Sequence, residues 1–339
     1  MIGIGVVGYG YWGPNLVRNF MELEESQVVA VCDLNPRRLR QAAARYPTLT
    51  TTTRYEDLLA DGRIDAIAIA TPVSSHFELA MQALQAGKHV LVEKPFVATV
   101  AQGEELVETA AARSRVLMVD HTFIYTAAVR KIRELVEAGR LGRLYYYDSV
   151  RVNLGLFQHD VNVLWDLAVH DLAIMDYVLG RLPEAVTATG MAHIPGQPED
   201  VAYVTCFFGD TLIAHFHVNW LAPVKIRRTL IGGDRQMIVY DDLEPSEKVK
   251  VYDKGITLND NHQPDGLYQV LVGYRTGDMW APQLDTVEAL RREAAHFLDC
   301  IVHGHKPLTD GEVGLRVVRL LEAADRSLRQ RGRPVEIAP

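Results

Sequence analysis

Short runs of consecutive apolar residues recur through the first 120 residues, and stretches with helical spacing separate them. The apolar runs cover residues 2–7, 28–32, 66–70, 89–92 and 116–119. They do not alternate apolar with polar positions, which is typical of strands buried on both faces of a parallel sheet. Between them, helices are predicted at 14–23, 36–45, 55–60, 75–87 and 99–113. Residues 1–120 are therefore expected to form an α/β domain with a doubly wound parallel sheet.

Beyond residue 120 apolar positions alternate with polar ones, which is the pattern of half-buried strands. Such strands are predicted at 144–153, 185–191, 201–208, 212–220, 225–232 and 236–241. Several follow one another too closely for crossover helices, and Gly209-Asp210 and Gly233-Asp234 mark two turns, so the sheet is expected to be mainly antiparallel. Helical spacing returns at 127–138, 166–179, 286–302 and 312–329. Residues 121–339 are therefore expected to form a second, α+β domain.

The overall composition fits globular domains and argues against several other classes. With 339 residues, the chain has the length of about two domains. Its net charge is −8 and its basic clusters are short, so no nucleic-acid partner is expected, because phosphate binding needs a clustered positive face. No run approaches the roughly 18 apolar residues of a membrane helix, so no membrane association is expected.

The three cysteines, Cys32, Cys206 and Cys300, are far apart and form no CxxC motif. Neither a metal site nor a disulfide framework is therefore indicated. Such cysteine usage is typical of a reducing compartment. The apolar segment 1–8 lacks the basic start of a signal peptide and leads straight into a glycine loop. A cytoplasmic location is the resulting expectation.

A glycine-rich motif, GYGYWG at residues 8–13, follows the first predicted strand and opens the first predicted helix. In this context GxGxxG is typical of dinucleotide binding. The first glycine permits a tight turn, the second lets a pyrophosphate approach the backbone, and the third allows close packing of helix on strand. Free N–H groups at the helix N-terminus then bind the pyrophosphate. The residues expected to bind the cofactor here are Gly8, Gly10, Tyr11, Trp12 and Gly13.

Asp33 ends the second predicted strand. An acidic residue there accepts hydrogen bonds from the adenosine ribose and repels a 2′-phosphate, which favours NAD over NADP. Arg37 and Arg38 follow closely, and an arginine near this position can bind that phosphate. A solvated helix face is the favoured interpretation of both arginines.

The next predicted strand is followed by Thr71-Pro72, at the sheet edge where ligands bind, so both residues are expected to contact the cofactor. Ser74 or Ser75 is placed to cap the helix that follows. His76 lies at the start of that helix. It is either a cofactor contact or a partly exposed capping or packing histidine.

The strand after that ends in Glu93-Lys94-Pro95, again at the ligand edge of the sheet. A lysine in such a position can shift its pKa and move a proton. A surface Glu–Lys pair is an equally open interpretation.

Asp166 and His170 lie four residues apart in a predicted helix, so they are expected to share one face. One interpretation is a histidine–carboxylate pair facing the cofactor. The other is a helix N-cap at Asp166 with a packed His170. The spacing offers no third ligand, so a metal is not indicated.

Taken together, these motifs resemble the glucose–fructose oxidoreductase, inositol dehydrogenase and MocA-like (Gfo/Idh/MocA) family. The resemblance rests on GYGYWGPN at 8–15, Asp33, Glu93-Lys94-Pro95 and Asp166-x-x-x-His170-Asp171, and it covers nearly the whole chain. It implies a Rossmann domain followed by a domain with an open, mostly antiparallel sheet, with the active site between them. It further implies that Glu93 and Lys94 contact the cofactor and that dimers or tetramers assemble through the exposed sheet face. The catalytic residues that it implies are Lys94, His170 as acid/base, and Asp166 as a substrate-orienting carboxylate.

The segments WGPN at 12–15, RVNLG at 151–155 and the stretch containing Asn162 resemble the nucleotide-sugar branch of this family. Its members transfer hydride at C3 of a nucleotide-linked hexose, such as a UDP-N-acetylhexosamine. The expected substrate-binding residues are Lys94, Arg151, Asn153, Asn162, Trp165, Asp166 and His170. Trp280 and Gln283, at the end of the polar segment 259–280 and just after it, are further candidates.

Other functions remain open at this point. The chain can be a dehydrogenase of a free sugar or an inositol, since the resemblance spans these branches. A hydrolase that uses NAD transiently is a weaker alternative. A non-catalytic NAD-binding sensor is the alternative outside enzymes, because a fold does not fix a function.

Overall fold

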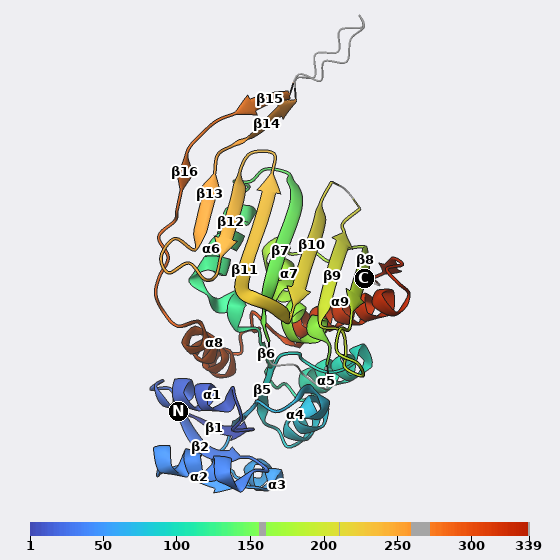
Figure 1. Cartoon of the computed structure of the whole chain (residues 1–339). Coiled ribbons are helices and arrows are strands. Elements are labelled where there is room, and N and C mark those ends of the chain that lie inside the picture. Colours follow the sequence, from blue (N-terminus) through green and yellow to red (C-terminus); the bar gives the residue numbers. More distant parts are fainter. Residues whose placement is uncertain (156–160, 210, 259–271, 338–339) are drawn as a thin grey trace, which may run out of the picture. The chain divides into compact units, whose positions relative to one another are not determined.

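The computed structural model describes residues 1–155, 161–209, 211–258 and 272–337 (Figure 1). The chain folds into two units. Unit 1 comprises residues 1–126 and 286–322, and unit 2 comprises 127–285 and 323–339.

Unit 1 contains a six-stranded sheet whose paired strands are all parallel. The strand order is β3-β2-β1-β4-β5-β6, so the direction of winding reverses between β1 and β4, where α/β proteins bind ligands. The strands are β1 (Ile2–Val7), β2 (Ser26–Cys32), β3 (Thr50–Thr52), β4 (Ala66–Ile69), β5 (His89–Glu93) and β6 (Leu117–Asp120). This confirms the predicted doubly wound domain.

The helices within the first 126 residues lie close to their predicted positions. They are α1 (Gly13–Met21), α2 (Pro36–Arg45), α3 (Tyr55–Ala60), α4 (His76–Gln85) and α5 (Val100–Ala112), with short turns η1 (Val73–Ser75) and η2 (Thr122–Tyr125). Strand β3 has no counterpart in the prediction, because its three threonines carry no apolar run. Among the described strands it pairs with β2 alone, at the edge of the sheet.

Two late helices change the expected division at residue 120. Helix α8 (Ala289–His303) packs against α1 and η2, and the rings of Phe20 and Phe297 meet edge to face at 6.4 Å. Helix α9 (Gly311–Arg329) begins in unit 1, and Asp310 just before it forms a bridge with Met118 of β6. The chain therefore returns to unit 1 after residue 285. The local spacing of apolar residues does not encode this return, because it depends on contacts between segments far apart in sequence.

Unit 2 contains a nine-stranded mixed sheet with the order β16-β13-β12-β11-β7-β10-β9-β8-β17. Within this sheet, β7 and β10 are the only described neighbours that pair in parallel, and β16 and β17 stand at opposite edges, which confirms an open, mainly antiparallel sheet. The strands are β7 (Leu144–Leu154), β8 (Ala185–Met191), β9 (Val201–Phe207), β10 (Ile213–Asn219), β11 (Leu221–Gly233), β12 (Met237–Asp241), β13 (Val249–Tyr252), β16 (Met279–Trp280) and β17 (Val335–Glu336). A separate pair is formed by β14 (Gly255–Leu258) and β15 (Val272–Arg275).

The two faces of this sheet differ in what covers them. Helix α7 (Val169–Leu179) packs on β7, and α6 (Ala127–Glu137) packs on α7 (Figure 1). Along β9, Ala202, Val204 and Cys206 are buried, whereas Tyr203 and Phe207 on the opposite face are 42% and 38% exposed. Alternation of this kind follows from the two-residue period of a strand.

Candidate functional site

The glycine motif forms the turn between β1 and α1 in the way its spacing predicts. Gly8 has a φ of +90°, and a Cβ there would lie 2.5 Å from the carbonyl oxygen of Ala70, so only glycine fits. A Cβ at Gly13 would lie 2.0 Å from the carbonyl oxygen of Gly8, so this glycine allows α1 to begin close to β1. At Gly10 the nearest atoms to a Cβ are 3.7 Å away, in the Arg38 guanidinium. These three positions fit the approach of a pyrophosphate to the backbone.

Asp33 lies beside this loop and is 6% exposed. Its carboxylate accepts hydrogen bonds from the backbone N–H groups of Tyr9 and Asn35, each at 2.7 Å. The guanidinium of Arg38 is 3.5 Å from the same carboxylate. Arg38 is exposed, with 49% of its side chain accessible, which agrees with the favoured solvated-face interpretation, and its guanidinium also lies beside Asp33 and Gly10. Arg37 is exposed, as that interpretation expects.

Thr71, Pro72 and His76 form a second loop cluster, after β4. His76 is completely buried, and its ring nitrogens lie 2.8 Å from the carbonyl oxygen of Thr71 and 2.9 Å from that of Pro95. It therefore ties the loop after β4 to the loop after β5, and the expectation of a partly exposed histidine is wrong. Ser75 precedes α4 but does not cap it, because its hydroxyl bonds Thr71 and Pro72 instead.

The ends of β5 and β6 place four polar residues side by side. Glu93 is paired in register with Asp120, so Lys94 and His121 are the next residues of neighbouring strands. Asp120 accepts a hydrogen bond of 2.7 Å from the indole N–H of Trp12, at the start of α1. Burial, together with the positive charge of Lys94, lowers the pKa of His121 to about 3. Lys94 and Trp12 thus belong to one polar cluster in unit 1.

Sequence reasoning missed Asp120 and His121, because they look like the polar end of an apolar run. Their position in the sequence could have marked them as site residues. Both follow a parallel strand at its carboxyl end, which is the criterion that singled out Lys94.

In unit 2, a π-helical turn, η3 (Leu164–Ala168), precedes α7 and carries Asp166, while His170 lies in the first turn of α7. Turns of this kind are frequent at functional sites. The carboxylate of Asp166 accepts a hydrogen bond of 2.9 Å from the indole of the fully buried Trp220. Asp166 does not cap the helix, because the side chain of Asn162 accepts from the backbone N–H groups of Leu164 and Trp165 instead.

Arg151 does not line an open pocket, contrary to expectation. It is 3% exposed and forms an ion pair with Asp171, with an Nε–Oδ2 distance of 2.7 Å. The hydroxyl of Ser149 donates to the same carboxylate at 3.0 Å. Arg151 therefore joins β7 to α7. Asn153, two residues further along the same face of β7, is half-buried.

Asn162 and Trp165 are also engaged inside unit 2. Both donate to the carboxylate of Asp325, from the Asn162 amide at 2.9 Å and from the Trp165 indole at 3.1 Å. Trp165 is 7% exposed. The expectation that they bind substrate is not supported by these contacts, since their polar atoms serve the packing of η3 on α9. Half-buried Asp166, His170 and Asn153 remain the candidates in this unit.

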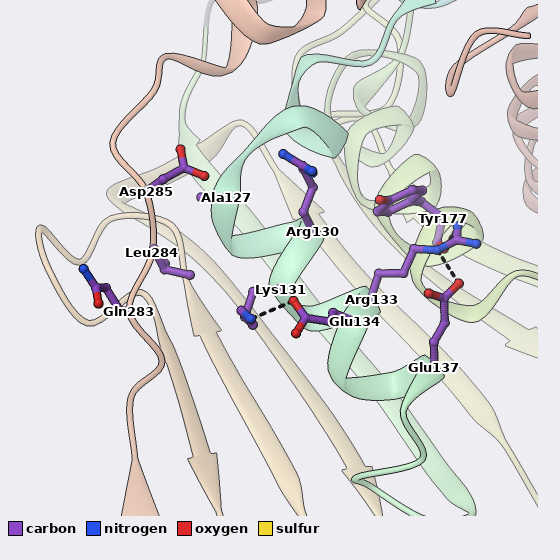
Figure 2. Close-up of a pocket in the computed structure, with 10 residues that line it drawn as sticks. All are labelled: Ala127, Arg130, Lys131, Arg133, Glu134, Glu137, Tyr177, Gln283, Leu284 and Asp285. Atoms are coloured by element: carbon purple, nitrogen blue, oxygen red, sulfur yellow. Dashed lines mark hydrogen bonds and ion pairs between the residues drawn. The ribbon is translucent and has the colours of Figure 1, made fainter. Parts of the chain in front are cut away.

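A surface pocket of about 680 Å³ lies elsewhere in unit 2, between α6, α7 and the segment 283–285 (Figure 2). Its charges are largely compensated: Lys131 pairs with Glu134, and Arg133 pairs with Glu137. Gln283 lines it, but Asp166 and His170 do not.

The polar segment 259–280, which also supplied a candidate substrate residue, is described only in part. Trp280 at its end pairs with Val251 of strand β13. Residues 259–271 lie outside the described part of the chain.

Within the described ranges, no three His, Cys, Asp or Glu side chains gather as a metal site would require. None of the helices in the same ranges combines the length and apolarity needed to cross a membrane.

Comparison with known proteins identifies the family. The profile of an oxidoreductase family with an NAD-binding Rossmann fold matches residues 2–121, and that of the GFO/IDH/MocA C-terminal domain matches residues 129–239. The uncharacterized oxidoreductase YdgJ of Escherichia coli is 30% identical over 262 residues, covering 73% of each chain. The chain belongs to the Gfo/Idh/MocA family of oxidoreductases, with an NAD-binding Rossmann domain.

Relatives with different substrates match almost the whole chain. The UDP-N-acetylglucosamine 3-dehydrogenase of Acidithiobacillus ferrooxidans is 29% identical over 318 residues, covering 93% of each chain. A solved structure of that enzyme superposes with a TM-score of 0.81 at 27% identity, covering 97% of this chain and 99% of that one. The myo-inositol 2-dehydrogenase of Thermotoga maritima is 23% identical over 344 residues, covering 97% of this chain and 96% of its own. Family membership therefore leaves the substrate open.

Proposed function

We propose that this protein is an NAD-dependent dehydrogenase that transfers hydride between the nicotinamide and C3 of a nucleotide-linked hexose, such as a UDP-N-acetylhexosamine. The observation that carries the proposal is the match to a UDP-N-acetylglucosamine 3-dehydrogenase over 93% of both chains. Arg151 and Asn162 no longer support the nucleotide-sugar branch, because both are engaged within unit 2. The substrate class therefore rests on the relative and not on those two residues.

The chemical roles follow from the properties of three side chains. Bound NAD supplies the hydride acceptor. Lys94 binds the reacting hydroxyl and favours the developing negative charge on its oxygen. His170 accepts the hydroxyl proton, so that loss of hydride leaves a neutral ketone. Asp166, whose carboxylate is fixed by the Trp220 indole, orients a neighbouring hydroxyl of the sugar.

The test is NADH formation with a panel of uridine- and thymidine-diphosphate hexoses, free hexoses and inositols, each supplied with NAD and with NADP. Turnover of a nucleotide sugar alone supports the proposal. Turnover of inositol or a free sugar alone would replace it with the function of the myo-inositol relative. A protein that binds NAD but turns over nothing in the panel, and that also holds no tightly bound NADH, would point to a sensor.

Cofactor choice is expected to depend on the pair Asp33 and Arg38. Replacing Asp33 by serine removes the charge that repels a 2′-phosphate and leaves Arg38 available to bind it. The ratio of kcat/KM for NADP to that for NAD is expected to rise about tenfold or more, the equivalent of roughly 1.4 kcal/mol. Adding Arg38→Ala should reverse the gain, whereas Arg37→Ala should not. An unchanged ratio in Asp33→Ser would contradict the assignment.

We also propose that the chain forms a dimer or tetramer through the face of the unit 2 sheet that lies opposite the buried side chains of Ala202, Val204 and Cys206. Three large apolar side chains on this face, Tyr203, Phe207 and Ile213, are 42%, 38% and 43% exposed. Tyr203→Glu is expected to shift the protein to a smaller species in light scattering, because a charge is costly to bury in an interface. The matched change Tyr11→Glu, at a tyrosine 87% exposed in unit 1, should leave the mass unchanged.

A further inference from the structure

Helix α8 carries a carboxyl group into the interior of unit 1. Glu293 is completely buried, and neither of its side-chain oxygens has a hydrogen-bond partner of regular geometry. A buried, uncompensated carboxylate is strongly unfavourable, so such a group either finds a partner or keeps its proton. The groups around Glu293 decide between these outcomes.

The groups that act on Glu293 come from three elements packed near it. Asp120 at the end of β6 and Thr122 of η2 lie against its carboxyl group, and the charge of Glu93 at the end of β5 also reaches it. Tyr125 of η2 is a further titratable neighbour. The two charges that act on Glu293 are thus both negative. Burial raises the pKa of Glu293 well above its ordinary value, and the charge of Asp120 raises it further.

Asp120 is the member of this pair that has hydrogen-bond donors beside it. Its carboxylate is 1% exposed and accepts hydrogen bonds from the Trp12 indole and from the Thr122 hydroxyl. Two donors favour an ionised carboxylate. Two neighbouring buried carboxyl groups do not both ionise, so the proton belongs on Glu293.

We propose that Glu293 is a positioning residue for the cofactor loop: its protonated carboxyl group supports the Asp120 carboxylate, which in turn holds the indole of Trp12. Trp12 is the residue from which α1 starts, within the motif that binds the dinucleotide. Glu293 therefore reaches the cofactor loop from a helix about 280 residues later in the chain, through one carboxylate and one indole. The inference depends on NAD binding and not on the choice of substrate.

The protonation is tested by the pH dependence of stability. Because Glu293 has a higher pKa in the folded protein than in the unfolded chain, folding binds a proton, and stability falls as the pH rises above the unfolded value. Glu293→Gln cannot bind that proton. The urea midpoint of the wild type is expected to fall relative to that of Glu293→Gln between about pH 5 and pH 8. A pH-independent difference between the two would overturn the proposal.

The positioning is tested by NAD affinity at neutral pH. Glu293→Leu, which has a similar volume but no donor, is expected to bind NAD about tenfold more weakly, whereas Glu293→Gln should stay within about twofold of the wild type. In a Trp12→Phe background, which lacks the indole N–H, Glu293→Leu should cause no additional loss. Equal affinity of all variants, or the same loss in both backgrounds, would overturn the route through Trp12.

A matched control lies on the same stretch of chain. Glu288, just before α8, pairs with Arg18 at 2.5 Å and is half-exposed. Glu288→Gln should not change the NAD affinity. It should also leave the pH dependence of the urea midpoint unchanged near neutral pH, because the pKa of Glu288 is lowered and not raised. Circular dichroism of each variant confirms that the loss in Glu293→Leu occurs in folded protein. All of these measurements need only NAD and urea, so they test Glu293 even if no sugar in the substrate panel is turned over.

Discussion

Replacing Lys94 by alanine is expected to lower kcat by about a hundredfold to a thousandfold, the usual range for loss of a group that stabilises developing negative charge in the transition state. Lys94 follows β5 directly, at the ligand edge of the Rossmann sheet, and its charge reaches the buried His121. NAD affinity should change far less, because the glycine loop and Asp33 remain in place. Steady-state kinetics with the substrate that the panel identifies, together with NAD titration, separates the two effects.

The matched control is Lys131→Ala. This lysine lies on α6, pairs with the exposed Glu134 and lines the surface pocket of unit 2 (Figure 2). It carries the same charge without a place in the proposed chemistry, so kcat should be unaffected. If Lys94→Ala retained more than about a tenth of the wild-type kcat, Lys94 would not stabilise the reacting oxygen in the rate-limiting step.

The combination with His170→Ala shows whether the two residues serve one step. Groups that act as a unit show strongly non-additive losses. The double variant is therefore expected to be about as slow as the slower single variant. Losses that multiply would instead assign Lys94 and His170 to independent steps.

The strands and the cofactor loop of unit 1 could be predicted because their determinants are local. The runs that become β1 and β4 contain no polar side chain and the three inner residues of β5 are apolar, since both faces of the parallel sheet are buried. The turn at Gly8 needs a positive φ and space beside Ala70, and glycine alone supplies both. Asp33 could be predicted to lie beside the loop for a similar reason, because it directly follows β2, the strand next to β1.

The roles of Arg151, Asn162 and Trp165 could not be predicted, because each depends on a partner far away in sequence. Arg151 is neutralised by Asp171, which the sequence presents only as the neighbour of His170. Asn162 and Trp165 meet Asp325 only once α9 has packed in place. Polar residues next to a candidate site suggest ligand binding, until a buried counter-charge shows that they hold elements together.

Breaking the ion pair between Arg151 and Asp171 is expected to lower the free energy of unfolding by about 3–5 kcal/mol, because the remaining buried charge loses its partner. Both side chains are 5% exposed or less, and Ser149 donates to the same carboxylate. Arg151→Met and Asp171→Asn should each show this loss in urea denaturation. The double variant should recover much of it, since no unpaired charge is then buried.

This experiment also decides what Arg151 is for. A matched pair, Arg227 with Asp242, lies 3.1 Å apart but is more exposed, at 28% and 18% of the side chains. Arg227→Met is therefore expected to cost only about 1 kcal/mol or less. If Arg151→Met instead left stability unchanged and raised KM, Arg151 would bind substrate after all. A large stability loss with unchanged KM would establish that it fixes β7 to α7, the helix that carries His170, and so acts on the site through the fold.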